Sequence, residues 1–388
     1  MIYFIILFLL LFFTLIYDFL KVKSGKKMVY YIVLIGLICL SGFRYRVGGD
    51  TLMYMIVHPR LPSLSELGSN HAINEKLQPL WIFFVAVSKS ITEEFYMIQL
   101  LHAIIINTLI FNFIKSNTKY IFTAILLYYI GYYGYFNFEI LRESIAVAIF
   151  LYSIKFIKNK KWVAYYIISL LALSVHFSAI VLFVIPLLLK LKFNLSRALI
   201  IFILGVIFGV FFIKILFSLN VGGGLVESIK LYLDYKPTFY GLISILVLYI
   251  LYPWVIYKIS NYYLKIESNL NNFLNVYILI GASTSFFFIF FRFLNYLTPI
   301  LFLFIAEIIH GVYRKGKLKQ VGLTSGILTF IIFSVIHMNA YFSDTSQFVE
   351  SSRWYSRWYP YYSIFDKEID ETREKLVIEQ NKFQLKKK

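Results

Sequence analysis

Residues 28–54 read MVYYIVLIGLICLSGFRYRVGGDTLMY, and this stretch indicates both the fold class and a site. Its first part, residues 28–43, is apolar and predicts a helix that crosses a bilayer. Arg44, Arg46 and Asp50 follow at once. A charged side chain at the bilayer centre costs roughly 2.5 kcal/mol or more. We therefore expect that a chain which gathers charges at the end of a hydrophobic helix uses them.

The rest of the chain is equally apolar. Of its 388 residues, 60% are hydrophobic, 20% aromatic and 15% charged, and the mean hydropathy is +0.74. Apolar runs of roughly 17–25 residues recur along the chain, and the period-two alternation of a membrane barrel is missing. The composition predicts an all-α, polytopic membrane protein. Its single cysteine, Cys39, rules out an internal disulfide.

The formal charge of +18 does not indicate nucleic-acid binding here. Outside the tail, the basic excess is concentrated in short loops at residues 21–27, 158–161 and 314–319, as the positive-inside rule requires. The first apolar segment, residues 2–20, is followed by lysines and preceded by no basic residue. This pattern predicts a membrane anchor with an outer N-terminus rather than a cleavable signal peptide. The second segment then delivers Arg44 to the outer face.

Two apolar segments do not fit a single crossing. Residues 79–91 are too short, so we expect a re-entrant or interfacial helix there. Residues 162–190 are too long for one straight crossing and predict a helical hairpin that turns near residues 174–178, with His176 at the outer side.

With these two assignments the chain makes about twelve crossings. Residues 1–340 form a transmembrane domain with an outer-face active site, and residues 341–388 form an outer tail, aromatic and then charged. The last five crossings are expected near residues 197–217, 238–258, 272–290, 293–313 and 321–338.

This topology gathers polar residues from separate parts of the chain at the outer boundary. They are Arg44, Arg46, Asp50, Arg142, His176 and Arg292. Basic residues at outer helix ends oppose the positive-inside trend, whereas binding of an anionic headgroup explains them. Gly48 and Gly49 supply a turn that can aim backbone N–H groups at an anion.

Each residue also has a structural interpretation. The side chains of Arg44 and Arg46 can simply reach from a helix end to the membrane–water interface. Asp50 can cap a helix or form an ion pair with these arginines. His176 fits a buried, hydrogen-bonded histidine as well as a catalytic base. Arg142 can pair locally with Glu139.

The order of several short motifs resembles the EpsG-like family of exopolysaccharide polymerases. The motifs are Arg44 and Arg46 with Gly48-Gly49-Asp50 and Tyr54, then Leu141-Arg142 with Ile145-Ala146, then Val175-His176-Phe177-Ser178-Ala179. The resemblance covers residues 1 to about 365. One departure is Gly49, where a small polar residue is expected.

The resemblance implies Wzy-type polymerisation in a multi-pass protein of the bacterial plasma membrane. The implied substrates are oligosaccharide repeat units on undecaprenyl pyrophosphate, joined at the outer face, with other polysaccharide assembly proteins as partners. No cofactor or metal is expected, and no nucleic acid.

Residue chemistry suggests roles for this reaction. Arginines grip phosphate oxygens in a bidentate fork, so Arg142 and Arg292 are expected at the pyrophosphate, with Arg44 and Arg46 as further contacts. His176 or Asp50 is the expected base, and aromatic residues such as Tyr54 and Tyr296 hold the substrate. The alternatives are a GT-C-type transferase that uses a polyprenyl-phosphate sugar, and a transporter or flippase of lipid-linked glycans.

Overall fold

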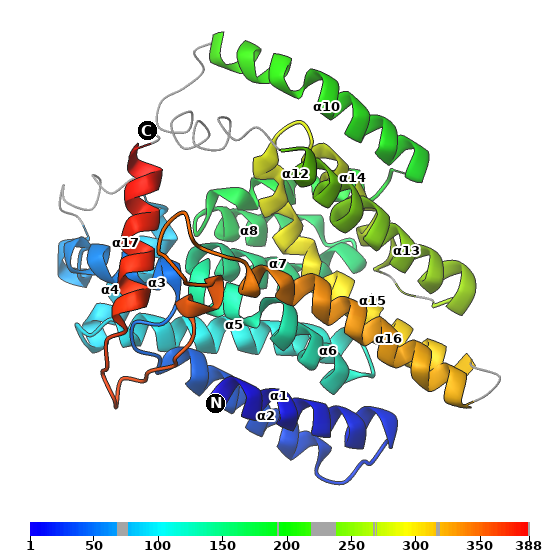
Figure 1. The fold of residues 1–388 in the computed structure, drawn as a ribbon, viewed down its shortest axis with the longest axis horizontal. Helices are drawn as coiled ribbons and strands as arrows, with labels where there is room; N and C mark the ends of the chain where they lie inside the picture. The colour runs from blue at the N-terminus through cyan, green and yellow to red at the C-terminus, as the bar shows by residue number, and fades with distance from the viewer. Residues whose placement is uncertain are drawn as a thin grey trace.

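The computed structural model describes residues 1–67, 77–191, 194–218, 238–266, 268, 270–315 and 319–386. These residues form helices joined by short loops and two isolated β-bridges, with no β-strand among them (Figure 1). The prediction of an all-α protein is therefore confirmed.

The α-helices follow one another along the chain as α1 (Ile2–Thr14), α2 (Lys26–Gly42), α3 (Gly49–Val57), α4 (Pro79–Ile91), α5 (Tyr96–Asn117), α6 (Ile121–Tyr128), α7 (Leu141–Lys158), α8 (Trp162–Leu173), α9 (Ile185–Leu188), α10 (Leu195–Ser218), α12 (Phe239–Ser244), α13 (Tyr252–Lys258), α14 (Asn271–Ser283), α15 (Phe291–Lys315), α16 (Lys319–Met338) and α17 (Glu371–Lys386). Shorter π or 3-10 turns extend several of them, such as Leu15–Phe19 after α1, Tyr129–Tyr133 after α6 and Ile245–Leu251 after α12.

Four helices in the described part of the chain are long and apolar enough to cross a membrane. They are Ile2–Phe19, Tyr96–Asn117, Phe239–Tyr263 and Phe288–Arg314. Helices also lie at the other predicted crossings, including α10 and α16, whose described apolar stretches are Leu195–Gly209 and Gly326–Met338. The protein is thus a helical membrane protein, and the count of twelve crossings stays a prediction.

The two unusual apolar segments have the predicted secondary structure. Residues Pro79–Ile91 form a helix of 13 residues, and its re-entrant or interfacial position stays a prediction. The hairpin is confirmed: α8 ends at Leu173, and the chain returns as a 3-10 helix over Phe177–Phe183. The Tyr165 hydroxyl donates to the Leu182 carbonyl at 2.6 Å, which places the two legs side by side.

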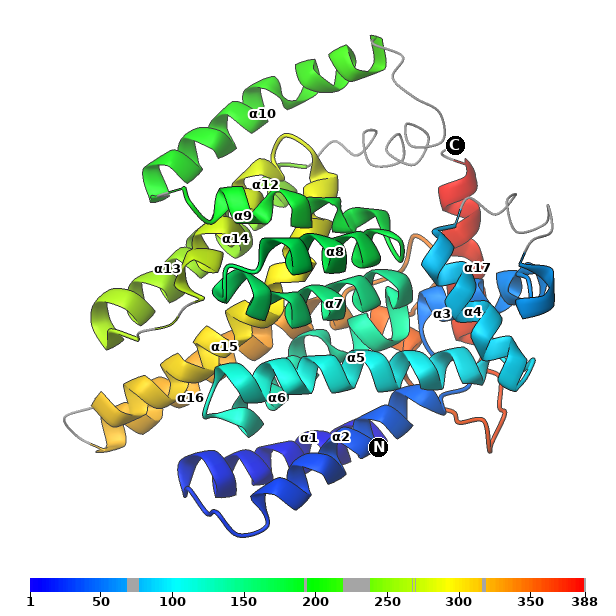
Figure 2. The same cartoon turned by 180° about the vertical axis from the view of Figure 1, so that it is seen from behind.

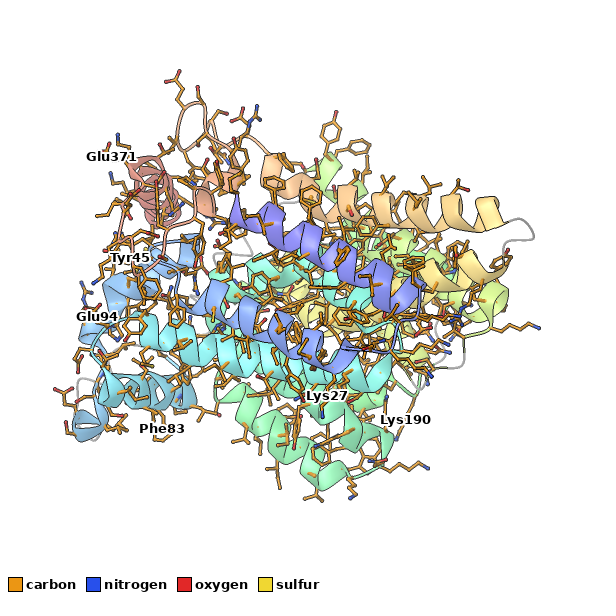
Figure 3. All side chains as sticks on the ribbon, turned by 90° about the horizontal axis from the view of Figure 1, so that it is seen from below. Lys27, Tyr45, Phe83, Glu94, Lys190 and Glu371 are labelled. Carbon is orange, nitrogen blue, oxygen red and sulfur yellow. The ribbon has the colours of Figure 1, made fainter. Side chains whose placement is uncertain are left out.

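The helices pack into a bundle whose two ends differ in charge. α5, α6, α7 and α15 pack in the middle, while the α1–α2 pair and α10 lie on opposite sides (Figures 1 and 2). Lys27 and Lys190 lie at one end, and Tyr45, Glu94 and Glu371 at the other (Figure 3). The positive-inside rule would place the end with Lys27 and Lys190 at the inner face, and this orientation stays a prediction. In the inner loop expected at residues 314–319, positions 316–318 lie outside the described residues.

The C-terminal segment folds back onto the loop between α2 and α3. Backbone N–H groups of Tyr45 and Gly48 donate to carbonyls of Tyr362 and Arg357, each at 2.8 Å, and Ile364 donates to Phe43 at 2.9 Å. Helix α17 packs beside α3 (Figure 1). The tail therefore forms part of the predicted outer end, close to the charged residues.

Candidate functional site

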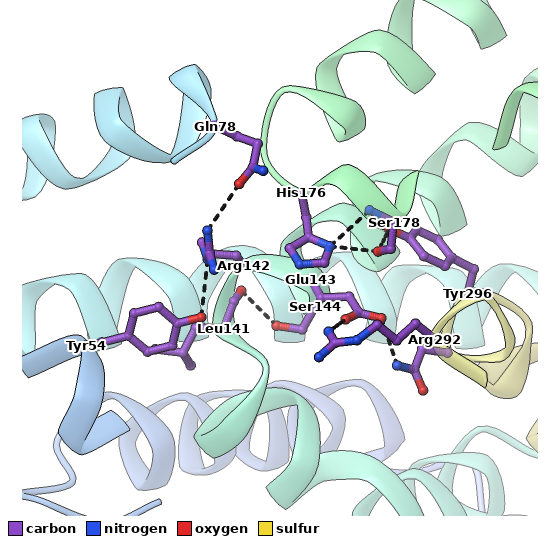
Figure 4. Close-up of polar contacts among 11 residues, drawn as sticks. Tyr54, Gln78, Leu141, Arg142, Glu143, Ser144, His176, Ser178, Arg292 and Tyr296 are labelled. Carbon is purple, nitrogen blue, oxygen red and sulfur yellow. Dashed lines mark hydrogen bonds and ion pairs between the residues drawn. The ribbon is translucent and has the colours of Figure 1, made fainter. Parts of the chain in front are cut away.

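Several helices begin at one place near this outer end. Asp50 lies in the first turn of α3, Gln78 precedes α4, Arg142 lies in the first turn of α7, and Arg292 lies in that of α15. The side chains of Gln78, Arg142 and Arg292 lie around the turn that holds His176 (Figure 4). Because a helix N-terminus carries a partial positive charge, this arrangement favours an anion.

Arg142 is held by neutral partners. Its Nε donates to the Tyr54 hydroxyl at 3.3 Å, and its Nη1 donates to Gln78 Oε1 at 3.1 Å (Figure 4). The local pair with Glu139 is not formed, because Glu139 accepts from other groups. These contacts orient a half-buried guanidinium without neutralising it, as an anion-binding arginine requires.

Arg292 is paired with a carboxylate. Its Nη1 lies 2.5 Å from Glu143 Oε2, and Asn295 Nδ2 donates to Glu143 Oε1 at 2.8 Å. Glu143 is buried, so the ion pair and the amide together satisfy it. Side-chain exposure of 25% leaves part of the Arg292 guanidinium accessible for a ligand.

His176 is fixed as a hydrogen-bond donor toward the site. The Ser178 backbone N–H donates to His176 Nδ1 at 3.2 Å, and the Ser178 hydroxyl lies 2.7 Å from the same nitrogen. That hydroxyl is 2.8 Å from the hydroxyl of the buried Tyr296. Partial burial, with Arg142 and Arg292 nearby, lowers the pKa of His176 to about 3. The ring is therefore neutral at pH 7, with its proton on Nε2.

The turn at Gly48 and Gly49 binds a carboxylate of the protein itself, that of Glu139. Glu139 accepts the backbone N–H groups of Gly49 at 2.8 Å and Asp50 at 3.2 Å, and Arg357 Nη2 lies 2.9 Å from its Oε2. The expectation that this turn presents its N–H groups to a substrate anion is therefore wrong, because a buried carboxylate already occupies them.

This arrangement requires glycine at position 48 and leaves little room for a side chain at position 49. Gly48 has a φ of +107°, and a side chain there would also collide with Phe138. A Cβ at Gly49 would displace the Arg357 guanidinium, which forms the ion pair with Glu139.

Asp50 is exposed to solvent beside these groups. Desolvation by neighbouring protein groups, together with the nearby Glu139 carboxylate, raises the pKa of Asp50 to about 6, against the opposing effect of Arg357. A carboxylate with a pKa in this range suits proton transfer near neutral pH.

Arg44 and Arg46 serve the local structure. Arg44 is fully buried and donates to the Ser41 carbonyl, to the Val47 carbonyl at 3.1 Å and to the Thr51 hydroxyl at 3.1 Å. Arg46 forms a bidentate pair with Glu374 of α17, at 2.6 and 2.7 Å. These contacts do not favour the predicted substrate contacts of either arginine.

A cavity of about 290 Å³ opens beside Arg142. Its lining includes Asp50, Tyr54, His58, Trp81 and Arg142, with apolar residues from α4 and α5. Among the residues that the structure describes, no group of three or more His, Cys, Asp or Glu side chains could hold a metal ion. The chemistry that the cavity offers is therefore binding of an anion beside an acid–base carboxylate.

The structure brings six predicted residues together: Asp50, Tyr54, Arg142, His176, Arg292 and Tyr296. Gln78, Glu143 and Arg357 also belong to the site but are not among the predicted site residues, and Glu139 was expected only as a local partner of Arg142. A signal existed for Glu139 and Glu143, because acidic residues within apolar sequence require partners. Arg357 lies in the tandem Ser-Arg-Trp-Tyr sequence at residues 352–359, which is typical of an interface or a sugar-stacking segment, but only the fold of the tail brings it to Glu139.

Comparison with known proteins supports the resemblance. The sequence model of the EpsG family matches residues 27–363. Comparison with curated proteins and with solved structures gives no match. The matched range contains the motifs around Arg44, Arg142 and His176, and it ends within the C-terminal segment that packs on the site.

Proposed function

Because the chain belongs to the EpsG family, whose members are membrane proteins of the exopolysaccharide-polymerase type, we propose that it joins lipid-linked oligosaccharide repeat units. The substrates are carried on undecaprenyl pyrophosphate, and the reaction takes place at the outer face of the bacterial plasma membrane. The observation that carries this proposal is Arg142, whose guanidinium is oriented by neutral partners where several helix N-termini meet.

Arg142 and Arg292 bind the pyrophosphate of the donor. An arginine stays charged at every physiological pH and can hold two phosphate oxygens at once. Negative charge on the pyrophosphate grows as its bond to the anomeric carbon breaks. Fixed cations and helix N-termini around that group therefore stabilise the transition state more than the ground state. The Nε2–H of His176 donates to the same departing group.

Asp50 accepts the proton of the acceptor hydroxyl. The hydroxyl oxygen of the acceptor sugar forms the new bond to the anomeric carbon while undecaprenyl pyrophosphate leaves. Of the two predicted bases, Asp50 fits better, because its raised pKa of about 6 leaves it mostly ionised at pH 7. His176 Nδ1 already accepts from Ser178. Tyr54 and Tyr296 position Arg142 and Ser178 respectively.

The test is polymerisation by the purified protein in vesicles that contain lipid-linked repeat units. We expect a ladder of products on a gel, unchanged by a chelator, and loss of the ladder in Arg142→Ala and His176→Ala at equal protein level. Normal ladders from both variants would remove the catalytic assignment. Unchanged single repeats from folded wild-type protein, with label crossing the vesicle membrane, would indicate a transporter.

A further inference from the structure

A second cavity, larger than the one beside Arg142, is lined in part by Glu139, Asn295 and Arg357. It has a volume of about 450 Å³, within the roughly 300–1,000 Å³ of typical ligand sites. Helices α15 and α16, the Ile245–Leu251 turn and the C-terminal segment form its walls. Half of its lining is aromatic: Tyr132, Tyr135, Tyr249, Tyr252, Tyr277, Phe291, Tyr341, Trp354 and Trp358.

Three residues of this lining carry buried polar atoms without a hydrogen-bond partner. The atoms are His337 Nε2, Arg357 Nε and Trp358 Nε1. Buried polar groups in folded proteins are almost always satisfied, so such a group on a cavity wall marks a place where a ligand or water binds. His337 lies on α16 and the other two lie in the C-terminal segment, so a ligand that satisfies all three brings several hydrogen-bonding groups of its own.

The cavity adjoins the proposed reaction centre. Its lining includes Glu139, which accepts from the Asp50 backbone, and Asn295, which donates to Glu143 beside Arg292. The Arg357 guanidinium stands over the rings of Trp354 and Trp358, at 5.1 and 5.8 Å from their centroids. A molecule in this cavity therefore reaches toward the same groups that act on the donor.

We propose that this cavity binds the sugar rings of the growing glycan, a claim that rests on the proposed function. Sugar rings have apolar faces, which stack on Tyr and Trp, and hydroxyl edges, which pair with the imidazole, indole and guanidinium nitrogens. An isoprenoid chain would fill the volume but leave these nitrogens unpaired. Because each bound sugar adds contacts, the site holds the chain between additions and favours longer products.

His337→Leu and Trp358→Phe test the proposal directly. Each change removes an unpartnered polar atom and keeps most of the apolar volume. If these side chains only pack, the change is neutral or stabilising, because it removes an unsatisfied buried group. If they bind sugar, the variant loses affinity. Trp254→Phe is the matched control, since Trp254 packs against a separate cluster with Ile250 and Ile278.

The probe is a set of oligosaccharides of one to three repeat units, released by hydrolysis from the polymer that the host cell makes. Binding to the full-length protein in detergent is followed by tryptophan fluorescence and by thermal shift. We expect saturable binding by wild type and Trp254→Phe, and at least tenfold weaker binding by His337→Leu and Trp358→Phe. With lipid-linked substrate, these two variants should give shorter polymer than wild type and Trp254→Phe at equal protein level.

Unchanged affinity and unchanged product length in both variants would overturn the proposal. So would binding of farnesyl phosphate, sensitive to Trp358→Phe, without binding of the oligosaccharides. Absence of polymer from wild type, together with Trp358-sensitive oligosaccharide binding, would count against the polymerase function and support the glycan site.

Discussion

Two groups of arginines lie near the outer end of this protein, and they differ in what their charges do. Arg44 and Arg46 follow α2 and are engaged by backbone carbonyls and by Glu374 of the tail. Arg142 and Arg292 lie at the starts of α7 and α15. Arg292 is paired with Glu143, much as Arg46 is with Glu374, and its proposed role rests on its place beside His176. Arg142 is instead oriented by the neutral groups of Tyr54 and Gln78.

This difference shows that a charge at a membrane boundary serves either the fold or a ligand, according to its partners. A fully buried guanidinium that hydrogen-bonds to its own chain fixes a loop and cannot reach a substrate. A half-buried guanidinium held by neutral acceptors keeps its charge available to an anion. We therefore expect mutations in the two groups to affect different measurements.

The largest effect should come from Arg142→Ala. Loss of a cation at the departing pyrophosphate should lower the rate of polymerisation about 100-fold or more. The melting temperature in detergent should change little, because the contacts of Arg142 with Tyr54 and Gln78 lie at the site surface. Both quantities are measured on the same purified sample. A large fall in melting temperature would place Arg142 with the structural group instead.

The pH dependence should identify the base. If Asp50 accepts the proton, the rate should fall about tenfold for each pH unit below its pKa of about 6, because the carboxylate becomes protonated. His176, with a pKa lowered to about 3, stays neutral over the same range. The slow residual activity of His176→Gln should therefore reach half of its maximum at the same pH as the wild-type activity. A midpoint that moves with this change would assign the titration to His176.

Arg44→Ala should act on stability. The change removes a buried side chain and leaves the carbonyls of Ser41 and Val47 without a donor, at a cost of about 3 kcal/mol in the free energy of unfolding. Thermal unfolding and membrane protein level report the loss. Activity per folded molecule should remain. A stable but inactive variant would mean that Arg44 contacts the substrate, as the sequence suggested.

The smallest effect should come from the pair between Arg46 and Glu374. Both side chains are partly exposed, at 27% and 21%, so breaking the pair should cost about 1 kcal/mol or less. Arg46→Ala and Glu374→Ala should each lower the melting temperature slightly. The double variant should melt at the same temperature as either single variant, because the pair is lost only once. If instead the effects of the two changes add, the pair contributes nothing and the tail is held by its other contacts.

Much of the fold was predictable because its signals are local. Apolar length predicted the helices, and the 29-residue segment at 162–190 predicted the hairpin that presents His176. The site was predictable in part: the charges around Asp50, Arg142 and Arg292 stand out in apolar sequence. The internal anion at Gly49 was not predictable, because nothing near that turn specifies that Glu139, 90 residues away, will occupy it.

The sequence by itself determined the membrane class, the positions of the helices and the lysine-rich end, because hydropathy and charge act over one helix length. Only the tertiary structure decided which charges serve the fold and which remain for a ligand. Arg46 meets Glu374 across 328 residues, and Arg292 meets Glu143 across 149. Such pairs form only when the helices pack. Packing also desolvates each charged group and so changes its pKa, and the neighbours that cause this are not specified by any local sequence pattern.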